Sequence, residues 1–488
     1  MKTVWTIAGF DNSGGAGILN DCRALSVLGV MPLTINTANT SQNGTKVFGI
    51  EPVSPHWIQM QFDSLKMMGW PQAIKIGLLP TVEIMDRVFH CLKDFQGPIV
   101  FDPVMGASVG APWMTVEQSE HLKKHWLRSI TVFTPNIPEA ERLLGIAIHS
   151  QEEMLAAAKT LCALGAKNVI LKGGHLAGEW VGDVWTNGEQ HAWLHLSRIP
   201  IENTHGTGCT YSAALAGALA LGYSLRDAWV LARMVVQQGI RLAQPMQQVH
   251  YVQPKQWPSD AVDLPTLSDG SPEIQPFKSC RKSIGFYPIV DSLEWLERLI
   301  KWGVPSVQLR LKNLSIKQCQ FIIRRAVEMT QDSDIQLFIN DYWEIAVDCG
   351  AYGVHLGQGD VESADIAFIR NAGLRLGVST HSYSELARAI SVRPSYIALG
   401  PIFPTTSKIM PFAPQGIDTL KQWRSLVQTD LVAIGGINLN NISKVLNCPV
   451  DGVAVISAIT QAEDPKHACQ QFLEIIHERT ISSSTAIA

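Results

Sequence analysis

A cysteine that follows two closely spaced glycines marks the stretch of this chain best suited to phosphate chemistry, Asn203–Ala214 (NTHGTGCTYSAA). An apolar run rich in small residues follows and stops at Gly222, as helices commonly do. Gly206 and Gly208 therefore predict bare backbone N–H groups at a helix N-terminus, which is an anion site that suits phosphate. Cys209 would lie in the first turn, where a lowered pKa makes a thiol a base or nucleophile. The pattern also fits a glycine-rich loop before a packed helix with a buried cysteine.

The elements that must position this loop alternate between strand and helix, which is typical of α/β folds. A glycine-rich turn follows the first strand, but its spacing is not the dinucleotide-binding G-x-G-x-x-G. Polar residues end later strands, among them Asp102 and Lys172, and Glu139 lies just beyond another strand. With the anion loop, they predict a phosphoryl-transfer site in which carboxylates order Mg²⁺ and the nucleotide. Asp102 also fits a turn residue before Pro103, and Glu139 also fits a first-turn helix residue. Strands are expected over 3–9, 73–79, 99–102, 131–134 and 168–172, and a helix over 18–28.

Seven blocks in the first half carry a family resemblance. They are AGFDNSGGAGILND (8–21), TANTSQN (37–43), KIGLL (75–79), DPVM (102–105), TPNIPEAE (134–141), LKGGH (171–175) and NTHGTGCT (203–210). In this order they resemble the hydroxymethylpyrimidine/phosphomethylpyrimidine kinase family, which has the ribokinase-like fold. The resemblance covers roughly residues 1–255. It implies ATP-dependent phosphorylation of the pyrimidine precursor of thiamine, first at the alcohol and then at the monophosphate.

The same resemblance implies roles for single residues. Gln42 matches the family's pyrimidine-reading glutamine, whose amide can both donate to and accept from an aminopyrimidine edge. Gly9 and Ala16 match the positions that approach the ring closely. Cys209 stands where the wider ribokinase fold places an aspartate base and where this family places a cysteine.

Two departures from the family pattern leave the substrate preference and the rate open. The family usually follows DPVM with an A-K-S-G run, whereas residues 106–110 are GASVG and contain no lysine. A phosphate contact is therefore expected to be missing or to come from elsewhere. Phe10 also replaces the usual small hydroxyl residue beside Asp11.

Composition limits the classes of protein that this chain can be. Its 488 residues, 46% of them hydrophobic, suffice for two or three domains. The net charge of −4 gives no electrostatic case for nucleic acid or an anionic membrane. Nine cysteines without a C-x-x-C pair fit a reducing compartment, and no signal peptide or spanning segment is evident, so we expect a cytoplasmic protein. A proline-rich polar segment, 258–283, is expected to be a linker or a covering arm between domains at 1–257 and 284–480.

The second half has the pattern of a compact (β/α)₈ barrel. Eight short apolar runs alternate with helical stretches in about 175 residues, and polar residues follow the ends of the runs, where barrel enzymes place active residues. Among these residues, the cations Arg310, Lys312 and Lys408 suit a diphosphate, and the carboxylates Asp341 and Asp360 suit Mg²⁺. Glycines after the seventh strand and a serine after the eighth suit a phosphate. Singly, each also fits ordinary turn chemistry. The strands are expected over 284–290, 306–309, 335–339, 353–356, 375–378, 396–399, 431–434 and 452–456.

The blocks YPIVD, VQLRLK, FINDY, GVHLGQGD, GVSTHS, ALGPIFPTTSK, AIGGI and VAVISAI resemble thiamine-phosphate synthases from about residue 286 to 464. The one departure is the absence of the threonine that usually precedes Asp291. The resemblance implies that Asp341 and Asp360 bind Mg²⁺. It implies a pyrimidine diphosphate site formed by Gln308, Arg310, Lys312, Asn340, Ser379 and Lys408. It also implies a thiazole phosphate site formed by Thr405, Thr406, Ser407, Gly436, Ile456 and Ser457.

Together the halves predict a bifunctional enzyme of thiamine biosynthesis, a ribokinase-like α/β domain followed by a TIM barrel. Small molecules, ATP and Mg²⁺ are its expected ligands, with no nucleic acid or membrane as partner. The sequence leaves the oligomeric state open, and a homo-oligomer is compatible with it. One alternative is that a half, more readily the kinase half, binds a precursor without turnover. Another is a pyridoxal-type kinase joined to an unrelated phosphate-binding barrel.

Overall fold

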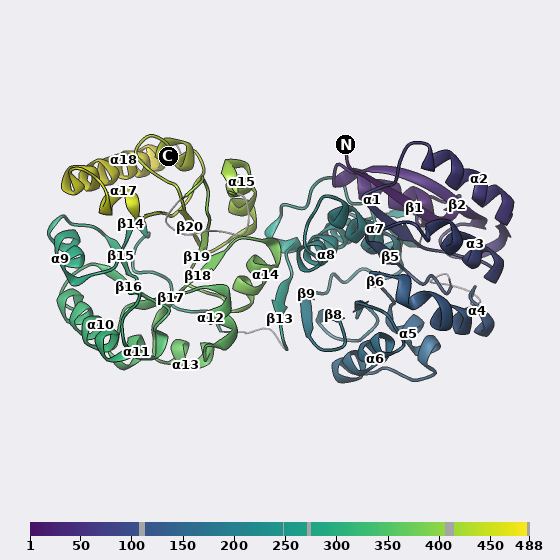
Figure 1. Ribbon diagram of the computed structural model, residues 1–488, viewed down its shortest axis with the longest axis horizontal. Coiled ribbons are helices and arrows are strands. Elements are labelled where there is room, and N and C mark those ends of the chain that lie inside the picture. Colours follow the sequence, from purple (N-terminus) through teal and green to yellow (C-terminus); the bar gives the residue numbers. More distant parts are fainter. Residues whose placement is uncertain (107–112, 247, 271–274, 406–413, 486–488) are drawn as a thin grey trace. The chain divides into compact units, whose positions relative to one another are not determined.

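A computed structural model describes residues 1–106, 113–246, 248–270, 275–405 and 414–485 of the chain. Its contacts divide the chain into two compact units (Figure 1). The first comprises Met1–Pro258 with Asp263–Pro272, and the second comprises Ser259–Val262 with Glu273–Ala488. In the described part of the chain, no helix combines the length and apolar character needed to cross a membrane.

The first unit is built on one ten-stranded sheet, in the order β13-β9-β8-β7-β6-β5-β4-β1-β2-β3. Its centre, from β2 through β1 and β4 to β7, is parallel, and β3, β8, β9 and β13 join antiparallel. The carboxyl ends of the central strands therefore meet at one edge, where open α/β sheets bind ligands. The strands are β1 (Thr3–Asp11), β2 (Met31–Gln42), β3 (Val47–Pro52), β4 (Ala73–Ile76), β5 (Ile99–Phe101), β6 (Val132–Phe133), β7 (Val169–Leu171), β8 (Trp180–Thr186), β9 (His191–Ser197) and β13 (Thr266–Ser268).

Helices cover this sheet, and most begin at a side-chain cap. Ser54, Thr81 and Ser150 each accept a backbone N–H of the first turn that follows, which satisfies a donor that the helix leaves open. The apolar α7 packs against α1, α8, β1, β4 and β5. The helices are α1 (Gly17–Val27), α2 (Pro55–Lys66), α3 (Val82–Leu92), α4 (Val116–His121), α5 (Ile137–Leu144), α6 (Gln151–Ala163), α7 (Thr207–Ala220) and α8 (Leu225–Arg241). A small sheet contains β10 (Thr204–His205), β11 (Gln244–Met246) and β12 (Val249–Tyr251).

The segment predicted to be a linker is more ordered than its composition suggests. Its residues Thr266–Ser268 form β13, which pairs antiparallel with β9 at an edge of the first sheet. Asp263, just before it, is fully buried and pairs with Arg241 (Nη2 to Oδ2 2.6 Å). Phe277, beyond the undescribed residues 271–274, is buried and its N–H donates to Arg393 O in the second unit. Both ends of the segment are thus parts of the folded units, which fits a covering arm better than a free linker.

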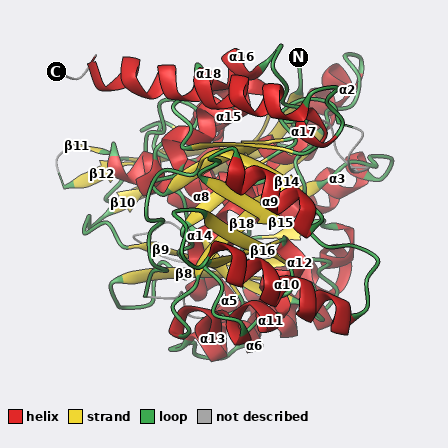
Figure 2. Cartoon of the chain, turned by 90° about the vertical axis from the view of Figure 1, so that its left-hand side faces the viewer, coloured by secondary structure: helices red, strands yellow, loops and turns green. Residues whose placement is uncertain are grey.

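The second unit contains a closed barrel of eight parallel strands, which confirms the predicted (β/α)₈ architecture. The observed strands match the expected ones to within two residues at either end, because each is a short β-branched run that is buried on both faces. Several of the strands can be followed in Figure 2. They are β14 (Gly285–Val290), β15 (Ser306–Leu309), β16 (Gln336–Asn340), β17 (Gly353–Leu356), β18 (Arg375–Thr380), β19 (Tyr396–Leu399), β20 (Asp430–Ile434) and β21 (Gly452–Val455).

Aromatic side chains fill the core of the barrel. Phe338 packs edge-to-face on Tyr287, Tyr352 and Tyr396, with ring centroids 5.1–5.8 Å apart. This geometry is favoured by the ring quadrupoles. The helices of the unit are α9 (Leu293–Lys301), α10 (Ile316–Thr330), α11 (Trp343–Asp348), α12 (Gln358–Ser363), α13 (Ile366–Asn371), α14 (Tyr383–Ser391), α15 (Gly416–Leu426), α16 (Ile442–Leu446), α17 (Ser457–Thr460) and α18 (Pro465–Thr485).

Candidate active sites

The glycine-rich turn after β1 is held by one carboxylate. Asp11 accepts hydrogen bonds from the N–H and hydroxyl of Ser13 and from the N–H of Ala16, each at 2.8 Å. His205 Nε2 lies 3.1 Å from the same carboxylate. Burial opposes the charge of Asp11, but the bonds from His205 and Ser13 bring its pKa below the ordinary value. The turn and the segment before α7 are thereby tied together.

The predicted pyrimidine-binding residues gather around this turn. Gln42 ends β2, is buried, and donates from Nε2 to Thr40 Oγ1 at 3.0 Å, while its backbone N–H donates to Asn12 Oδ1 at 2.8 Å. Gly9 lies in β1, and Ala16 is the residue just before α1. A Cβ at Gly9 would lie 3.0 Å from the Leu78 side chain. The turn, Gln42 and Gly9 therefore share one region of the first unit.

The predicted anion loop has the geometry that its glycines require. Gly206 is the N-cap of α7 with φ +92°, a left-handed conformation that favours glycine. A Cβ there would lie 2.0 Å from Gly15 O, so the two glycine-rich segments meet backbone to backbone. Asn20 Nδ2 also donates to Gly206 O at 2.9 Å. At Gly208, a Cβ would lie 3.3 Å from Asp102 Oδ2 and 3.4 Å from Lys172 Nζ, so the loop lies directly at these two charged groups.

Asp102, Lys172 and Glu139 form a charged cluster beside the predicted anion loop of the first unit. Lys172 Nζ lies 2.7 Å from Asp102 Oδ1, and the two side chains are 12% and 3% exposed. Burial, and then repulsion by Asp102, outweigh attraction by Lys172 and raise the pKa of Glu139 to about 7. Glu139 also completes a capping box with Asn136 at the start of α5, which confirms the alternative reading of Glu139 as a first-turn helix residue. Two carboxylates so close together are a donor set that suits Mg²⁺ with nucleotide phosphates.

The expectation that helix α7 lowers the pKa of Cys209 is wrong for this structure. Burial dominates and raises the pKa of the thiol to about 11, although the ammonium of Lys75 and the N–H of Gly17 oppose the rise. Lys75 and Asp21 form a pair that sequence reasoning missed, with Nζ 2.7 Å from Oδ2 and both side chains fully buried. A lysine in the otherwise apolar β4 was the signal that could have identified it.

In the barrel, the predicted metal pair does come together. Burial, and then repulsion by Asp360, raise the pKa of Asp341 above its ordinary value. The nearby guanidinium of Arg310 opposes this rise. Asp341 itself has φ +65°, a strained conformation for a residue other than glycine. Asp360 also accepts the Gly357 N–H at 3.2 Å as the cap of α12. In the described part of the chain no three His, Cys, Asp or Glu side chains gather around one point, but two carboxylates suffice for Mg²⁺ that also binds phosphate.

The predicted pyrimidine diphosphate residues lie at several levels of the barrel. Gln308 and Asn340 are buried on β15 and β16, Ser379 is partly exposed on β18, and Arg310 and Lys312 follow β15, with Lys312 exposed. A buried hydrogen-bond chain connects two of them. Gln308 Nε2 donates to Tyr287 OH (3.3 Å), Tyr287 OH bonds Tyr396 OH (2.8 Å), Tyr396 OH bonds His355 Nδ1 (2.7 Å), and His355 Nε2 bonds Ser379 Oγ (2.8 Å).

The expected thiazole phosphate site is described in part. Gly436 follows β20 with φ +66°, and a Cβ there would lie 2.4 Å from Pro404 O. This places the glycine against the segment that contains Thr405. Ile456 and Ser457 lie where β21 leads into the short α17. The predicted residues Thr406, Ser407 and Lys408, and most of the GASVG segment, lie outside the described residues.

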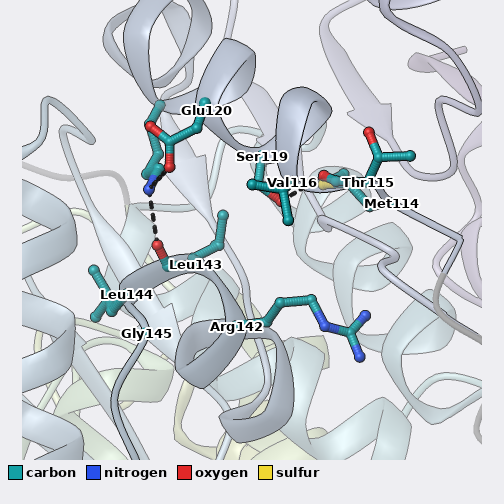
Figure 3. Close-up of a pocket in the computed structure, with 10 residues that line it drawn as sticks. Met114, Thr115, Val116, Ser119, Glu120, Arg142, Leu143, Leu144 and Gly145 are labelled. Carbon is teal, nitrogen blue, oxygen red and sulfur yellow. Dashed lines mark hydrogen bonds and ion pairs between the residues drawn. The ribbon is translucent and has the colours of Figure 1, made fainter.

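A separate cavity of about 510 Å³ lies at α4 and α5 (Figure 3). Its cations are already engaged, since Lys123 Nζ donates to Leu143 O at 3.0 Å and Arg142 Nη1 donates to Met105 O at 3.0 Å. None of the predicted site residues lines it. The lining residues are Met114, Thr115, Val116, Ser119, Glu120, Lys123, Arg142, Leu143, Leu144 and Gly145.

The first unit has a glycine loop at a helix N-terminus with paired charges beside it, and the second has a carboxylate pair and a glycine-rich strand end. Both arrangements are typical of transferases that handle phosphate groups. A family model described as phosphomethylpyrimidine kinase matches residues 11–255, and one described as thiamine monophosphate synthase matches residues 286–459. The chain belongs to these two families, the first at its N-terminal half and the second at its C-terminal half. It is a bifunctional enzyme of thiamine biosynthesis with a kinase unit and a synthase unit.

Individual proteins are similar to one half or the other. A thiamine-phosphate synthase of Serratia proteamaculans is 53% identical over 202 residues, which are 41% of this chain and 95% of that protein. The pyridoxal kinase from Staphylococcus aureus in complex with AMP-PCP and pyridoxal is 29% identical, with a TM-score of 0.50 over 55% of this chain and 98% of its own. A phosphomethylpyrimidine kinase from Clostridium difficile 630 is 34% identical, with a TM-score of 0.43; the match covers 48% of this chain and 98% of that kinase. The first unit has the expected ribokinase-like fold, and neither alternative function is favoured.

Proposed function

We propose that the kinase unit transfers the γ-phosphoryl group of ATP to hydroxymethylpyrimidine and then to its monophosphate at the N-terminus of α7. The observation that carries this site is the convergence of Gly208 with Asp102 and Lys172. Backbone N–H groups at Gly206–Gly208 would hold the transferred oxygens, and Lys172 would exchange part of its attraction to Asp102 for the phosphates. Mg²⁺ held by Asp102 and Glu139 would supply further neutralisation of phosphate charge.

Cys209 is proposed as the group that accepts the proton of the substrate hydroxyl. The hydroxyl oxygen forms a bond to the γ-phosphorus, the bond to ADP breaks, and the proton passes to the sulfur. Phosphoryl transfer needs little basicity early in the reaction, because its transition state is loose. Only the thiolate form of Cys209 can take up this proton; burial disfavours that form, and the buried ammonium of Lys75 favours it. Gln42, whose Nε2 already donates to Thr40, would offer Oε1 to the pyrimidine amino group.

For the synthase unit, we propose that the pyrimidine diphosphate binds between Gln308 and the cations after β15. The bond from the methylene carbon to the diphosphate oxygen breaks first, because the aminopyrimidine ring stabilises the cationic carbon. The thiazole nitrogen then forms the new bond to this carbon. Arg310 and Lys312 neutralise the leaving diphosphate, and Mg²⁺ held by Asp341 and Asp360 would add to that neutralisation. Lys408, Asn340 and Ser379 complete the proposed diphosphate site.

The thiazole phosphate is proposed to bind where β20 and β21 end. The left-handed Gly436 lies against Pro404 O, and its backbone is proposed to contact the phosphate. Ile456 and Ser457 at the start of α17, with Thr405, Thr406 and Ser407, supply the remaining contacts. Nine free cysteines support a reducing compartment, and we propose the cytoplasm.

One assay tests both activities: hydroxymethylpyrimidine, ATP, Mg²⁺ and thiazole phosphate are incubated with the full chain, and thiamine phosphate is measured. Formation of thiamine phosphate supports both sites. If pyrimidine diphosphate must be supplied, the kinase half is a binding module without turnover. If pyridoxal is phosphorylated in preference to the hydroxymethylpyrimidine, the first unit is a pyridoxal-type kinase. Failure with supplied pyrimidine diphosphate would overturn the synthase assignment.

A further inference from the structure

The chain of hydrogen bonds through the barrel core joins two residues that the proposed function assigns to opposite ends of one substrate. Ser379 is placed at the diphosphate and Gln308 at the ring. Tyr287 and Tyr396 are among the most deeply buried side chains of the unit, and His355 is 7% exposed. Each internal member contributes to two bonds of 2.7–3.3 Å. Such a buried network is well satisfied, so one bond cannot reverse by itself.

The chemistry of the members allows only two arrangements of protons. A hydroxyl donates one hydrogen bond, and a neutral imidazole donates from one nitrogen and accepts at the other. His355 is buried and its two ring nitrogens bond the hydroxyls of Tyr396 and Ser379, surroundings that favour the neutral ring. If Ser379 donates to His355, every bond points toward Gln308, which must then accept from Tyr287. If Ser379 instead accepts from His355, every bond points the other way, and Gln308 must donate.

A diphosphate oxygen selects between these arrangements, because it can only accept. When Ser379 donates to this oxygen, Ser379 Oγ must accept from His355 Nε2, and His355 Nδ1 accepts from Tyr396. Tyr396 then accepts from Tyr287, and Tyr287 accepts from the amide N–H of Gln308. The structure has this last orientation, with Gln308 Nε2 directed at Tyr287 OH at 3.3 Å. The Gln308 carbonyl oxygen is thereby left as an acceptor for another donor.

We propose that this hydrogen-bond chain is a specificity determinant, in which diphosphate binding at Ser379 holds the Gln308 amide in the orientation that accepts from the 4-amino group of the pyrimidine. This inference rests on the proposed synthase function. A 4-hydroxypyrimidine, in its oxo form, has an acceptor oxygen where the amino substrate has a donor. That oxygen would face the Gln308 carbonyl oxygen, and two acceptors repel each other. The hydrogen-bond chain therefore selects the amino substrate, although none of its three internal members, Tyr287, Tyr396 and His355, contacts that substrate. Those members are positioning residues.

The test compares the selectivity of full-length variants. The measured quantity is kcat/KM for the 4-amino pyrimidine diphosphate divided by that for its 4-hydroxy analogue, at saturating thiazole phosphate. Tyr396→Phe keeps the ring and removes the central hydroxyl, so we expect this ratio to fall about tenfold, as for a buried polar group that loses its partner. The KM for thiazole phosphate should not change. An unchanged ratio in folded Tyr396→Phe and Tyr287→Phe would overturn the proposal.

Tyr352→Phe is the matched control. Its ring also packs edge-to-face on Phe338, and its hydroxyl donates to Gln336 Oε1 at 2.6 Å, outside the chain. It should therefore lose stability comparably and keep the ratio. A fall in the ratio for Tyr352→Phe equal to that for Tyr396→Phe would show that general loosening, and not the chain, sets selectivity.

A direct measurement covers the case in which the variants do not fold. In the ¹⁵N-histidine-labelled wild-type chain with Mg²⁺ and inorganic diphosphate, His355 should carry its proton on Nε2 and not on Nδ1. Its resonances are assigned by their loss in His355→Gln. The opposite tautomer would overturn the proposed direction of the chain. Failure of the proposed function is distinguishable, because a wild-type chain without synthase turnover would still report its tautomer.

Discussion

Phosphorylation of the pyrimidine alcohol should follow the ionisation of Cys209. A base acts only when deprotonated, and burial raises the pKa of this thiol to about 11. At pH 7.5 roughly one site in 3,000 therefore carries a thiolate, and this fraction rises about tenfold per pH unit. Because kcat/KM reports groups of the enzyme before the substrate binds, we expect kcat/KM for hydroxymethylpyrimidine to rise about tenfold per unit between pH 7.5 and 9. Coupled measurement of ADP release gives the profile.

Two variants at position 209 separate this explanation from others. Cys209→Ala should lose about 10²–10⁴-fold in rate and also lose the rise above pH 8. Cys209→Asp supplies a carboxyl that ionises at lower pH than the thiol, so its profile should flatten in the same range. A flat wild-type profile together with near-normal activity of Cys209→Ala would refute the reasoning.

Three further predictions concern the buried pair, the metal and the connection between units. Lys75→Met leaves the Asp21 carboxylate buried without its cation and should destabilise residues 1–270 by about 3–5 kcal/mol in urea unfolding; adding Asp21→Leu should recover much of this, and no recovery would argue against an unpaired charge as the cause. Asp341→Asn should sharply lower thiamine phosphate formation from supplied pyrimidine diphosphate and raise the Mg²⁺ requirement, whereas an unchanged Mg²⁺ dependence would leave Asp341 without a metal role. Residues 1–270 and 275–488, expressed apart, should each fold and act, and together make thiamine phosphate at nearly the intact rate; a piece that is inactive alone but recovers on mixing would show a shared essential interface.

Local sequence patterns predicted much of this fold because both units are built from short buried strands with polar residues at their ends. Asp102 and Lys172 were expected to meet for that reason, since the carboxyl ends of parallel neighbours share an edge. The position of Gly206 was also predictable, because a left-handed N-cap next to another backbone tolerates little else.

What sequence reasoning missed depends on burial and on distant pairing. Thr266–Ser268 has no apolar period, and only its partner β9 makes it a strand. The pKa of Cys209 was expected to fall because the helix N-terminus is visible in the sequence, whereas the desolvation that outweighs it is not. Lys75 and Asp21 are 54 residues apart and pair only in the folded sheet. The direction of the chain from Gln308 to Ser379 likewise needs the positions of the residues between them.

Strand β13 has a consequence for how the two enzymes can be joined or separated. An uncovered edge strand offers unpaired N–H and C=O groups to any other extended chain, which is a route to aggregation. Here β13 (Thr266–Ser268) covers the edge of β9, and cutting the chain where the kinase motifs end would remove β13. A kinase gene trimmed at residue 257 would therefore encode a protein that exposes β9 and tends to associate edge to edge. Solubility after trimming at 257 and at 270 should differ for this reason.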